Sequence, residues 1–240
     1  MPPSLIEQHL HAGTALPPVT TAAGVIDSHL LGRIDYAEAL ELQEQLVRQR
    51  IDGVRGDTLL LLEHPDVYTI GRRRDTSSLG GTEALPHPVH VISRGGQATW
   101  HGPGQLVGYP ILDLNRRGRD LHRYLRALES VVIGVAEGFG VPAGRMEGQT
   151  GVWAGGRKLA SIGVGVRRWI SCHGFALNVD PSMAGFQAIV PCGIAGVEMT
   201  SLARERQGIT TDGPPPDWRT VAALVPQVLA AVLDRELAAG

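Results

Sequence analysis

A chain of 240 residues with 43% hydrophobic and 19% charged residues has an ordinary globular composition, and its length allows one substantial domain or two small ones. The formal net charge of −2 gives no overall attraction to nucleic acid or to an anionic membrane. Two cysteines, Cys172 and Cys192, are too few for a disulfide framework or an all-thiolate zinc site. No stretch approaches the roughly 20 apolar residues of a membrane helix, and the N-terminus lacks the basic and apolar regions of a secretory signal. These features predict a cytoplasmic protein with reduced thiols.

The first part of the chain predicts a leader followed by alternating strand and helix signals. Residues 1–24 mix Pro, Thr, Ala and Gly without periodicity, so we expect a poorly ordered leader before a single domain over residues 25–240. Asp35 and Glu38 form an N-cap signature for a helix that ends near Ile51. An exposed loop is expected over 75–88. Apolar runs predict strands over 25–31, 59–62, 67–70 and 89–93.

The second part of the chain predicts a strand, a long helix, three strands and a last helix. Apolar residues repeat at helical spacing from Leu121 to Val135, and Gly138 and Gly140 close that helix. Gly155 and Gly156 mark a tight hairpin turn. The strands are expected over 106–112, 151–154, 158–167 and 173–179, and the last helix over 218–237. Because the elements do not alternate regularly as βαβ units, the pattern favours an α+β fold, a mixed β-sheet with packed helices.

The stretch R-G-G-Q-A-T-W-H-G-P-G-Q at 94–105 is the densest concentration of chemistry in the chain. Glycine lets the backbone approach a ligand or adopt positive φ, at a cost in folding entropy. Four glycines beside Arg94, Thr99, Trp100 and His101 therefore indicate a shaped site rather than a mobile turn. His101 has two readings, as a substrate-positioning donor or proton shuttle and as a histidine that only hydrogen-bonds the loop backbone.

Cys192 and Lys158 are the candidate reactive pair. Cys192 lies between Pro191 and Gly193, and a cysteine acts as a nucleophile only as thiolate, which a nearby cation favours. Lys158 is the single lysine of the chain, since the other 21 of the 22 Lys+Arg residues are arginines. Unlike arginine, a partly desolvated lysine can also accept a proton. Taken alone, Cys192 could be a small buried hydrophobe and Lys158 a solvated surface residue.

Other cofactor chemistries find little support in the sequence. His87-x-x-His90 lies in a proline-containing loop without a carboxylate or cysteine beside it, so we expect no metal site. There is no phosphate-binding loop of the G-x-x-x-x-G-K-[ST] type, and no G-x-G-x-x-G between a strand and a helix. A nucleophile and a base without phosphate machinery point to acyl transfer through a thioester, with no cofactor.

These motifs together resemble the lipoyl(octanoyl) transferase family. The resemblance rests on L-L-L-E-H-P at 60–65, V-Y-T-x-G-R at 67–72, the glycine-rich stretch continued to Pro110, G-V-W at 151–153, R-K-L-A-S-I-G at 157–163, H-G-F-A-L-N at 173–178 and I-V-P-C-G-I at 189–194. The motifs follow one another in the right order over residues 60–194. The leader and the tail after about Glu205 carry none.

The resemblance implies a fold and a reaction. The fold would be that of the biotin and lipoate protein ligases, and the enzyme would be an acyltransferase of lipoate biosynthesis, monomeric and cytoplasmic. Its donor would be octanoyl-acyl carrier protein, and its acceptors would be lysines on lipoyl domains of 2-oxoacid dehydrogenases and on the glycine cleavage H protein. Cys192 would hold the acyl thioester and Lys158 would lower its pKa. The substrate-binding residues would be Arg94, Gly95, Gly96, Gln97, Ala98, Thr99, Trp100, His101, Ser161, Ile162, Gly163, Gly174, Phe175 and Ala176.

Further expectations concern the oxyanion and the docking surface. Backbone N–H groups near Gly193 or in the glycine-rich stretch could stabilise a tetrahedral oxyanion. Two arginine clusters could receive an acidic carrier protein, namely Arg72, Arg73 and Arg74, and Arg116, Arg117 and Arg119. The arginines of the second cluster could equally well solvate a loop.

Three rival functions differ in testable ways. An ATP-dependent lipoate or biotin ligase would need an adenylate site and no nucleophilic cysteine. A cysteine hydrolase would pass the acyl group to water. A non-catalytic lipoyl-domain binder would have no use for the lone lysine.

Overall fold

The architecture is taken from a computed structural model, which describes residues 5–71, 76–79, 85–194, 196–207, 209 and 216–237, with the side chains of residues 76, 77 and 192 left out. Its main feature is an eight-stranded sheet in the order β1-β2-β3-β7-β11-β10-β9-β8. All neighbours in this sheet are antiparallel except β2 and β3, which are parallel and are joined through helix α2. The strands are β1 (Thr14–Thr21), β2 (Gly24–Arg33), β3 (Asp57–Glu63), β7 (Gln105–Ile111), β8 (Gly144–Met146), β9 (Gln149–Ala154), β10 (Arg157–Arg167) and β11 (Ile170–Asn178).

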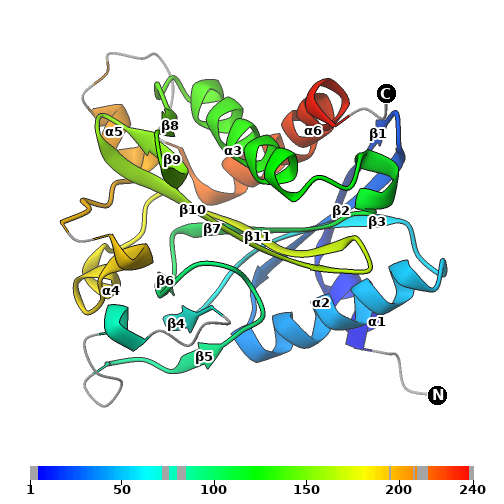
Figure 1. Ribbon diagram of the computed structural model, residues 1–240, viewed down its shortest axis with the longest axis horizontal. Helices are drawn as coiled ribbons and strands as arrows, with labels where there is room; N and C mark the ends of the chain where they lie inside the picture. The colour runs from blue at the N-terminus through cyan, green and yellow to red at the C-terminus, as the bar shows by residue number, and fades with distance from the viewer. Residues whose placement is uncertain are drawn as a thin grey trace.

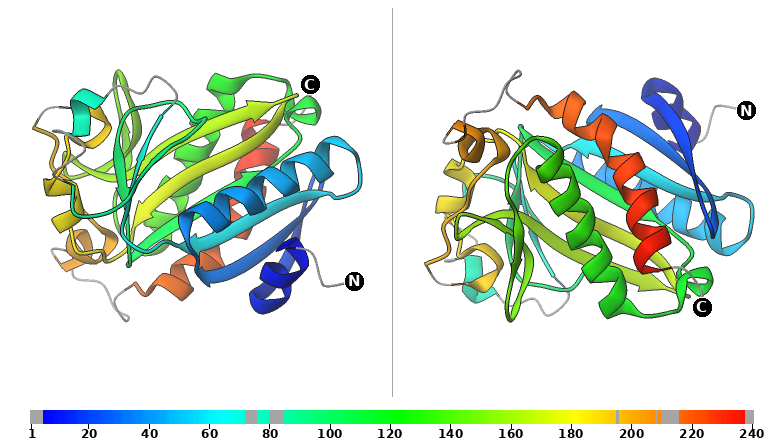
Figure 2. Two further views of the ribbon diagram at one scale, coloured as in Figure 1. Left: turned by 90° about the horizontal axis from the view of Figure 1, so that it is seen from below. Right: turned by 90° about the horizontal axis from the view of Figure 1, so that it is seen from above.

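Helices cover both faces of this sheet (Figure 1). Helices α3 (Leu121–Gly138) and α6 (Trp218–Glu236) lie side by side on one face, as the right-hand view of Figure 2 shows. Helix α2 (Tyr36–Ile51) crosses the other face, with α1 (Leu5–Ala12) beside it at the sheet edge. Asp35 caps α2 by accepting a hydrogen bond from the Ala37 N–H at 2.8 Å, as its position in the sequence predicts.

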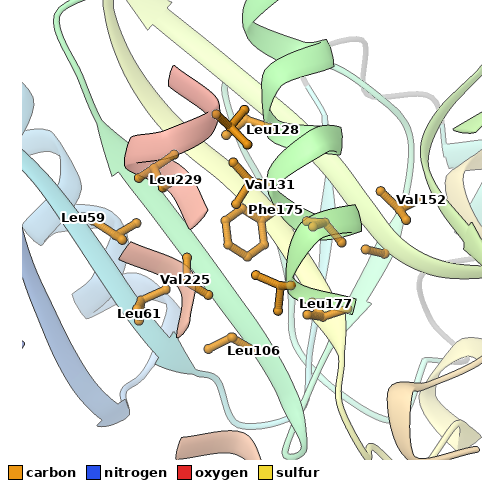
Figure 3. Packing of buried hydrophobic residues seen from close by; sticks show 14 of the residues in the cluster. Leu59, Leu61, Leu106, Leu128, Val131, Val152, Phe175, Leu177, Val225 and Leu229 are labelled. Atoms are coloured by element: carbon orange, nitrogen blue, oxygen red, sulfur yellow. The ribbon is translucent and has the colours of Figure 1, made fainter. Parts of the chain in front are cut away.

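The two helical layers explain why the strand at 57–63 reads as an unbroken apolar run. Leu59 and Leu61 belong to the core under α3 and α6, whereas Leu60 and Leu62 belong to the core under α2. A strand buried on both faces has no solvent side on which to place polar residues. Figure 3 shows the first core, in which the Phe175 ring lies among side chains of α3 and α6.

A small second sheet lies beside the large one. It has the order β5-β4-β6, from β4 (Val67–Ile70), β5 (Val89–Val91) and β6 (Thr99–His101). Its own apolar cluster packs against α4 (Ala184–Gln187), and the ring of Trp100 lies 5.1 Å from that of Phe186. The remaining short elements are α5 (Leu202–Gln207) and the 3-10 turns at Thr76–Leu79, Leu114–Arg117 and Pro191–Gly193.

The predicted α+β class, with a mixed sheet and packed helices, is confirmed, as are the strands and long helices expected from the periodicity. Two expectations are wrong. Residues 5–21 are not an irregular leader, because α1 packs Ile6 against the α2 core and β1 pairs with β2 along the sheet edge. The expected exposed loop at 75–88 contains buried Ser78 and Leu79, since Leu79 packs into the small apolar cluster. The extent of the domain over residues 25–240 stays a prediction.

Candidate active site

A pocket of about 270 Å³ opens on the α2 face of the large sheet, beneath the segment that carries the glycine-rich stretch. Its floor comes from β7, β10 and β11, where Ser161 pairs with Ala176 and Gly163 pairs with Gly174. The described residues that line it are Tyr36, Ile92, Arg94, Gly96, Gln97, Thr99, His101, Val107, Tyr109, Gly148, Gln149, Thr150, Lys158, Ser161, Ile162, Gly163, His173, Gly174, Phe175, Ala176 and Ile194.

Lys158 lies at one end of this pocket and is 1% exposed. Its Nζ donates a hydrogen bond to the carbonyl oxygen of Thr150 at 3.2 Å and lies 5.3 Å from the centre of the Trp153 ring. Within the described part of the chain, no carboxylate forms an ion pair with this amine. A buried amine without a neutralising acid is available to act on a group that enters the pocket.

The backbone on either side of Cys192 also reaches the pocket. Cys192 lies in the 3-10 turn Pro191–Gly193, and Ile194 lines the cavity together with Lys158. Gly193 has φ +68°, and a Cβ at that position would collide with the side chain of Gln97, another lining residue. The turn is therefore held against the glycine-rich stretch, and only glycine fits at its closest point.

The segment after Cys192 is attached directly to the strand that carries Lys158. The N–H of Lys158 donates to the Glu198 carbonyl at 2.8 Å, and the N–H of Thr200 donates to the Lys158 carbonyl at 2.9 Å. These bonds bring residues 198–200 alongside the start of β10. The two predicted reactive residues thus belong to adjoining pieces of backbone at one end of the pocket.

Gly193 does not supply the expected oxyanion donor. Its N–H donates to the Val190 carbonyl at 3.0 Å, and the N–H of Ile194 donates to Pro191 at 3.1 Å. Both amides are used to close the 3-10 turn itself. The glycine-rich stretch is then the remaining expected source of oxyanion donors.

Arg94 organises the glycine-rich stretch. Its guanidinium donates from Nη1 to the carbonyls of Gly95 and Gln97, and from Nη2 to the carbonyl and hydroxyl of Thr69, all between 2.9 and 3.0 Å. A Cβ on Gly163 would come within 2.8 Å of the Arg94 Cδ, so the arginine stem packs directly on β10. The planar five-donor fork of arginine suits this role, in which one side chain ties a loop to β4.

His101 belongs to a buried chain of hydrogen bonds. The Gln105 side-chain amide donates to Asn178 at 2.9 Å, so its oxygen accepts from His101 Nδ1 at 2.7 Å. His101 Nε2 therefore carries no proton and accepts from the Thr69 hydroxyl at 3.3 Å. Burial lowers the pKa of His101 to about 3, so the ring is neutral at physiological pH. Its hydrogen-bond partners are side chains of β4 and β7 rather than the loop backbone.

Aromatic and imidazole rings gather at the opposite end of the pocket from Lys158. His64 Nδ1 donates to the Ile34 carbonyl at 2.9 Å, so the neutral ring accepts at Nε2 from the Tyr109 hydroxyl at 2.8 Å. The rings of Tyr36 and His101 stack with centres 6.0 Å apart. Burial raises the pKa of Tyr109 well above its usual value and lowers the pKa of His173 to about 4. All these groups are therefore uncharged near neutral pH.

Most residues singled out in the sequence converge here, and some do not. The lining includes twelve of them, namely Arg94, Gly96, Gln97, Thr99, His101, Lys158, Ser161, Ile162, Gly163, Gly174, Phe175 and Ala176. Gly95 donates its N–H to the Val164 carbonyl, and Ala98 and Trp100 pack into the small apolar cluster. The Trp100 indole donates to Asp66 at 3.2 Å, away from the pocket. The side chain of Cys192 lies outside the described part of the structure.

Nine residues of the pocket wall were not among the predicted site residues, namely Tyr36, Ile92, Val107, Tyr109, Gly148, Gln149, Thr150, His173 and Ile194. Tyr36 opens α2 and Tyr109 lies in β7, where the apolar pattern alone gives both a core role. His173 has φ +57°, an unusual conformation for a residue other than glycine. It opens the motif H-G-F-A-L-N, but the motif does not show this conformation or its place in the pocket wall.

The two arginine clusters have different outcomes. Arg72, Arg73 and Arg74 lie outside the described residues. Arg117 is buried, with its side chain 1% exposed and its guanidinium 2.7 Å from Asp57, so it cannot contribute to a docking surface. Arg116 and Arg119 are exposed but lie near the tip of the β10–β11 hairpin, whereas Lys158 lies near the start of β10.

Two general properties complete the description. Over the described residues, no group of three or more His, Cys, Asp or Glu side chains could hold a metal ion. Within the same residues, every helix is too short or too polar to cross a membrane.

The amino-acid sequence of the chain is similar to those of known proteins. Residues 35–215 match the family of lipoyl protein ligase A/B catalytic domains. The octanoyltransferase of Geobacter sulfurreducens is 58% identical over 175 residues, which cover 73% of this chain and 73% of that protein. The octanoyltransferase of Synechococcus elongatus is 54% identical over 173 residues, which cover 71% and 74% of the two chains.

Solved structures share the fold at low sequence identity. Lipoate-protein ligase A bound with ATP has a TM-score of 0.64 at 14% identity, over 87% of this chain and 92% of that one. Biotin protein ligase from Aquifex aeolicus, in complex with biotin and ATP, has a TM-score of 0.52 at 17% identity, over 88% and 71% of the two chains. The expected likeness to the ligase catalytic fold is confirmed.

Proposed function

Because the chain belongs to the family of lipoyl protein ligase A/B catalytic domains, we propose that its pocket carries out octanoyl transfer, the activity for which its relatives from Geobacter sulfurreducens and Synechococcus elongatus are named. The enzyme is an acyltransferase of lipoate biosynthesis. The single observation that supports placing octanoyl transfer in this pocket is the set of residues that line it. One buried lysine lies at one end, the Arg94 guanidinium is bound to the backbone of the glycine-rich stretch and to Thr69, and the remaining lining residues carry no charge near neutral pH.

The cavity suits a medium-length acyl chain. Its volume of about 270 Å³ is bounded by apolar side chains such as Ile92, Val107 and Ala176. Each methylene buried there contributes about 0.8 kcal/mol. The carbonyl end of the chain belongs near Lys158, because the reacting carbonyl needs polar groups and the hydrocarbon tail does not.

The reaction proceeds in two acyl transfers. The Cys192 thiolate attacks the carbonyl carbon of the donor thioester, the bond to the donor sulfur breaks, and the donor leaves as its thiol after gaining a proton. The amine of the acceptor lysine then attacks the acyl-Cys192 thioester, forms an amide after losing a proton, and releases the Cys192 thiol. Splitting the transfer in this way needs no ATP, because the thioester keeps the acyl group activated.

Lys158 supports both steps. As an ammonium it stabilises the Cys192 thiolate, and as an amine it accepts the proton that the attacking lysine loses. Its hydrogen bond to Thr150 and its contact with Trp153 fix the Nζ at the end of the pocket.

The proposed donor and acceptors are those that the resemblance to the lipoyl(octanoyl) transferase family implies. The donor is an octanoyl-acyl carrier protein, and the acceptors are lysines of lipoyl domains on 2-oxoacid dehydrogenases and on the glycine cleavage H protein. The enzyme works as a monomer in the cytoplasm. A bi-partite lipoate protein ligase of Thermoplasma acidophilum, solved in a study of its E2 lipoyl domain, has the same fold with a TM-score of 0.59 at 13% identity.

Mass spectrometry of the intact protein tests the covalent step. After incubation with octanoyl-acyl carrier protein and no acceptor, the wild type gains one octanoyl group. Cys192→Ala loses this adduct, whereas Cys172→Ala, which removes the other cysteine, keeps it. An adduct that persists in Cys192→Ala contradicts the thioester assignment.

A rate measurement tests Lys158. Lys158→Arg keeps a positive charge but cannot accept a proton, so transfer to the lipoyl domain falls by roughly 10²–10⁴-fold. Near-normal transfer by Lys158→Arg removes the base role and leaves only the electrostatic one. Adding acceptor domain also separates the rivals, since a hydrolase yields free octanoic acid and a ligase needs ATP and a free acid as substrate.

A further inference from the structure

A second cavity of about 400 Å³ lies beside the pocket on the same face of the sheet. The floor of the first pocket includes the strand pairs Ser161–Ala176 and Gly163–Gly174 of the β10–β11 hairpin. The next pair on the same face, Gly165 opposite Cys172, forms the floor of the second cavity. The two cavities thus follow one another along one hairpin. The residues that line the second are Leu40, Gln43, Glu44, Val47, Ser93, Gly165, Val166, Arg167, Cys172 and His173.

The wall between the cavities is thin. The segment 93–95 crosses β10 at this point, where the Gly95 N–H donates to the Val164 carbonyl at 3.2 Å. A Cβ on Gly165 would approach the Ser93 carbonyl oxygen to 3.4 Å and His173 Cδ2 to 3.5 Å. His173 is the one residue, among those described, that lines both cavities.

His173 is held in this wall by its backbone rather than by its ring. Its N–H donates to the Gln43 side-chain oxygen at 2.8 Å, and its φ of +57° lies in the left-handed region that favours glycine. Such a conformation is strained and persists where the surroundings impose it.

The ring itself is 2% exposed and poorly bonded. Nδ1 has no hydrogen-bond partner, and Nε2 is 3.5 Å from the Ser93 hydroxyl. The strained position of His173 therefore gains little from hydrogen bonding. Its effect is to place an imidazole between two cavities.

We propose that His173 is the residue that limits acyl-chain length, by closing the tail end of the acyl pocket against the second cavity. This inference rests on the octanoyl transfer proposed above. Lys158 and the Gly193–Ile194 backbone mark the carbonyl end, and Tyr109 and His173, whose ring centres are 6.3 Å apart, mark the tail end. An octanoyl chain ends against this wall. Additional methylenes could lie in the second cavity, whose side walls include Leu40, Val47 and Val166.

Removing the His173 ring from the wall should shift the preference of the enzyme toward longer acyl chains. His173→Gly removes the ring and suits the left-handed backbone, because glycine adopts positive φ without strain. Each further methylene that packs against the apolar side of the second cavity, formed by Leu40 and Val47, strengthens binding by up to roughly fourfold. The ratio of kcat/KM for dodecanoyl- over octanoyl-carrier protein is therefore expected to rise by at least about tenfold.

Two further variants make the result specific. His173→Phe keeps a ring in the wall and should leave the chain-length ratio as in the wild type. Leu40→Phe on the His173→Gly background fills the second cavity, so it should remove the gain with dodecanoyl while octanoyl transfer remains. If His173→Gly does not fold, His173→Asn serves instead, because asparagine tolerates the left-handed region and has a shorter side chain than histidine. The His173→Asn enzyme should favour decanoyl donors.

The readouts separate this inference from the proposed function. A wild type that transfers no octanoyl group contradicts the function itself. A wild type that transfers octanoyl, combined with an unchanged chain-length ratio in folded His173→Gly or His173→Asn, overturns only the role of His173. Direct binding of the free fatty acids provides the matching measurement. Dodecanoic acid should raise the unfolding temperature of His173→Gly more than octanoic acid does. For His173→Phe, dodecanoic acid should raise the unfolding temperature no more than octanoic acid does.

Discussion

At the residue scale, the lone lysine was the most informative prediction, because arginine is used at the other 21 basic positions of the chain. In the structure Lys158 is buried in the pocket, so it is not a solvated surface residue. Tyr36, Tyr109 and His173 could not be predicted in the same way. They come from α2, β7 and β11, and only the pairing of those strands and the packing of α2 bring them together.

Arg94 allows a prediction about how the glycine-rich stretch is held. Its four hydrogen bonds come from two nitrogens of a rigid fork, which the single ammonium of lysine cannot reproduce. In Arg94→Lys, Gly96 and Gln97 lose their fixed position in the pocket wall. Since misplacement by about 1 Å can cost roughly 10²-fold, we expect kcat/KM for octanoyl transfer to fall by about that factor.

The control for Arg94→Lys is Arg33→Lys. The Arg33 side chain is 54% exposed, and its one ion pair among the described residues is a 3.5 Å contact with Glu63 at the ends of β2 and β3. Steady-state rates with octanoyl-carrier protein should therefore stay near those of the wild type in this variant. Equal rates for the two variants would mean that the Arg94 guanidinium does not order the loop.

At the scale of secondary structure, periodicity predicted the strands and helices that bury one face or two. The elements that it missed are short or lie where glycine and proline dominate. Strand β6 is inside the glycine-rich stretch and is defined by pairing with β4 rather than by its own composition. Strand β1 contains Pro17 and Pro18, which read as irregular chain, yet an edge strand tolerates proline because one side needs no ladder hydrogen bonds.

Helix α3 positions the strand next to Lys158 through Glu129. This carboxylate is 1% exposed, and its Oε1 accepts the Gly151 N–H at 3.0 Å. Gly151 follows Thr150, whose carbonyl accepts from Lys158. The other oxygen binds Arg126 at 2.7 Å and Arg145 at 2.9 Å. One acid thus joins α3, β8 and the start of β9.

Removing this acid should destabilise the protein. Glu129→Ala leaves the buried Gly151 amide without an acceptor, which costs about 1–3 kcal/mol of unfolding free energy. Arg126 and Arg145 are 54% and 40% exposed, so they turn to water at little further cost. Glu129→Gln keeps an acceptor for Gly151 and should lose less. Urea unfolding measures the difference, with Glu137→Ala, exposed on the same helix, as the control. Equal unfolding free energies for Glu129→Ala and Glu137→Ala would contradict the role of Glu129.

At the scale of the whole molecule, the α+β class followed from the sequence but the order of the strands did not. Strand β7 pairs with β3 and β11, which are far apart in the sequence, and no local signal fixes such partners. The same long-range pairing gathers polar rings from distant segments into one buried cluster. That cluster makes the stability of the entire fold depend on pH.

His64, His101 and His173 are each at most 7% exposed. Burial lowers the pKa of His64 and His173 to about 4 and that of His101 to about 3, against 6.5 for an ordinary histidine. Between pH 6.5 and about 4 the unfolded chain therefore binds protons that the folded chain does not. Stability is fully present above pH 6.5 and falls as the pH drops through this window, by up to about 1.4 kcal/mol per pH unit for each group.

Urea unfolding between pH 4.5 and 7.5 measures this dependence. We expect the unfolding free energy to fall toward acid with a combined slope between one and three times the single-histidine value, because three neighbouring imidazoles oppose one another's protonation. His173→Phe removes one of the three buried imidazoles and should make the slope shallower. His122→Gln removes an exposed imidazole and leaves the cluster intact. If the unfolding free energy of the wild type stays level or rises toward pH 4.5, these rings do not remain neutral in the folded protein. If the slope is shallower in His122→Gln than in His173→Phe, the titrating group lies outside the cluster.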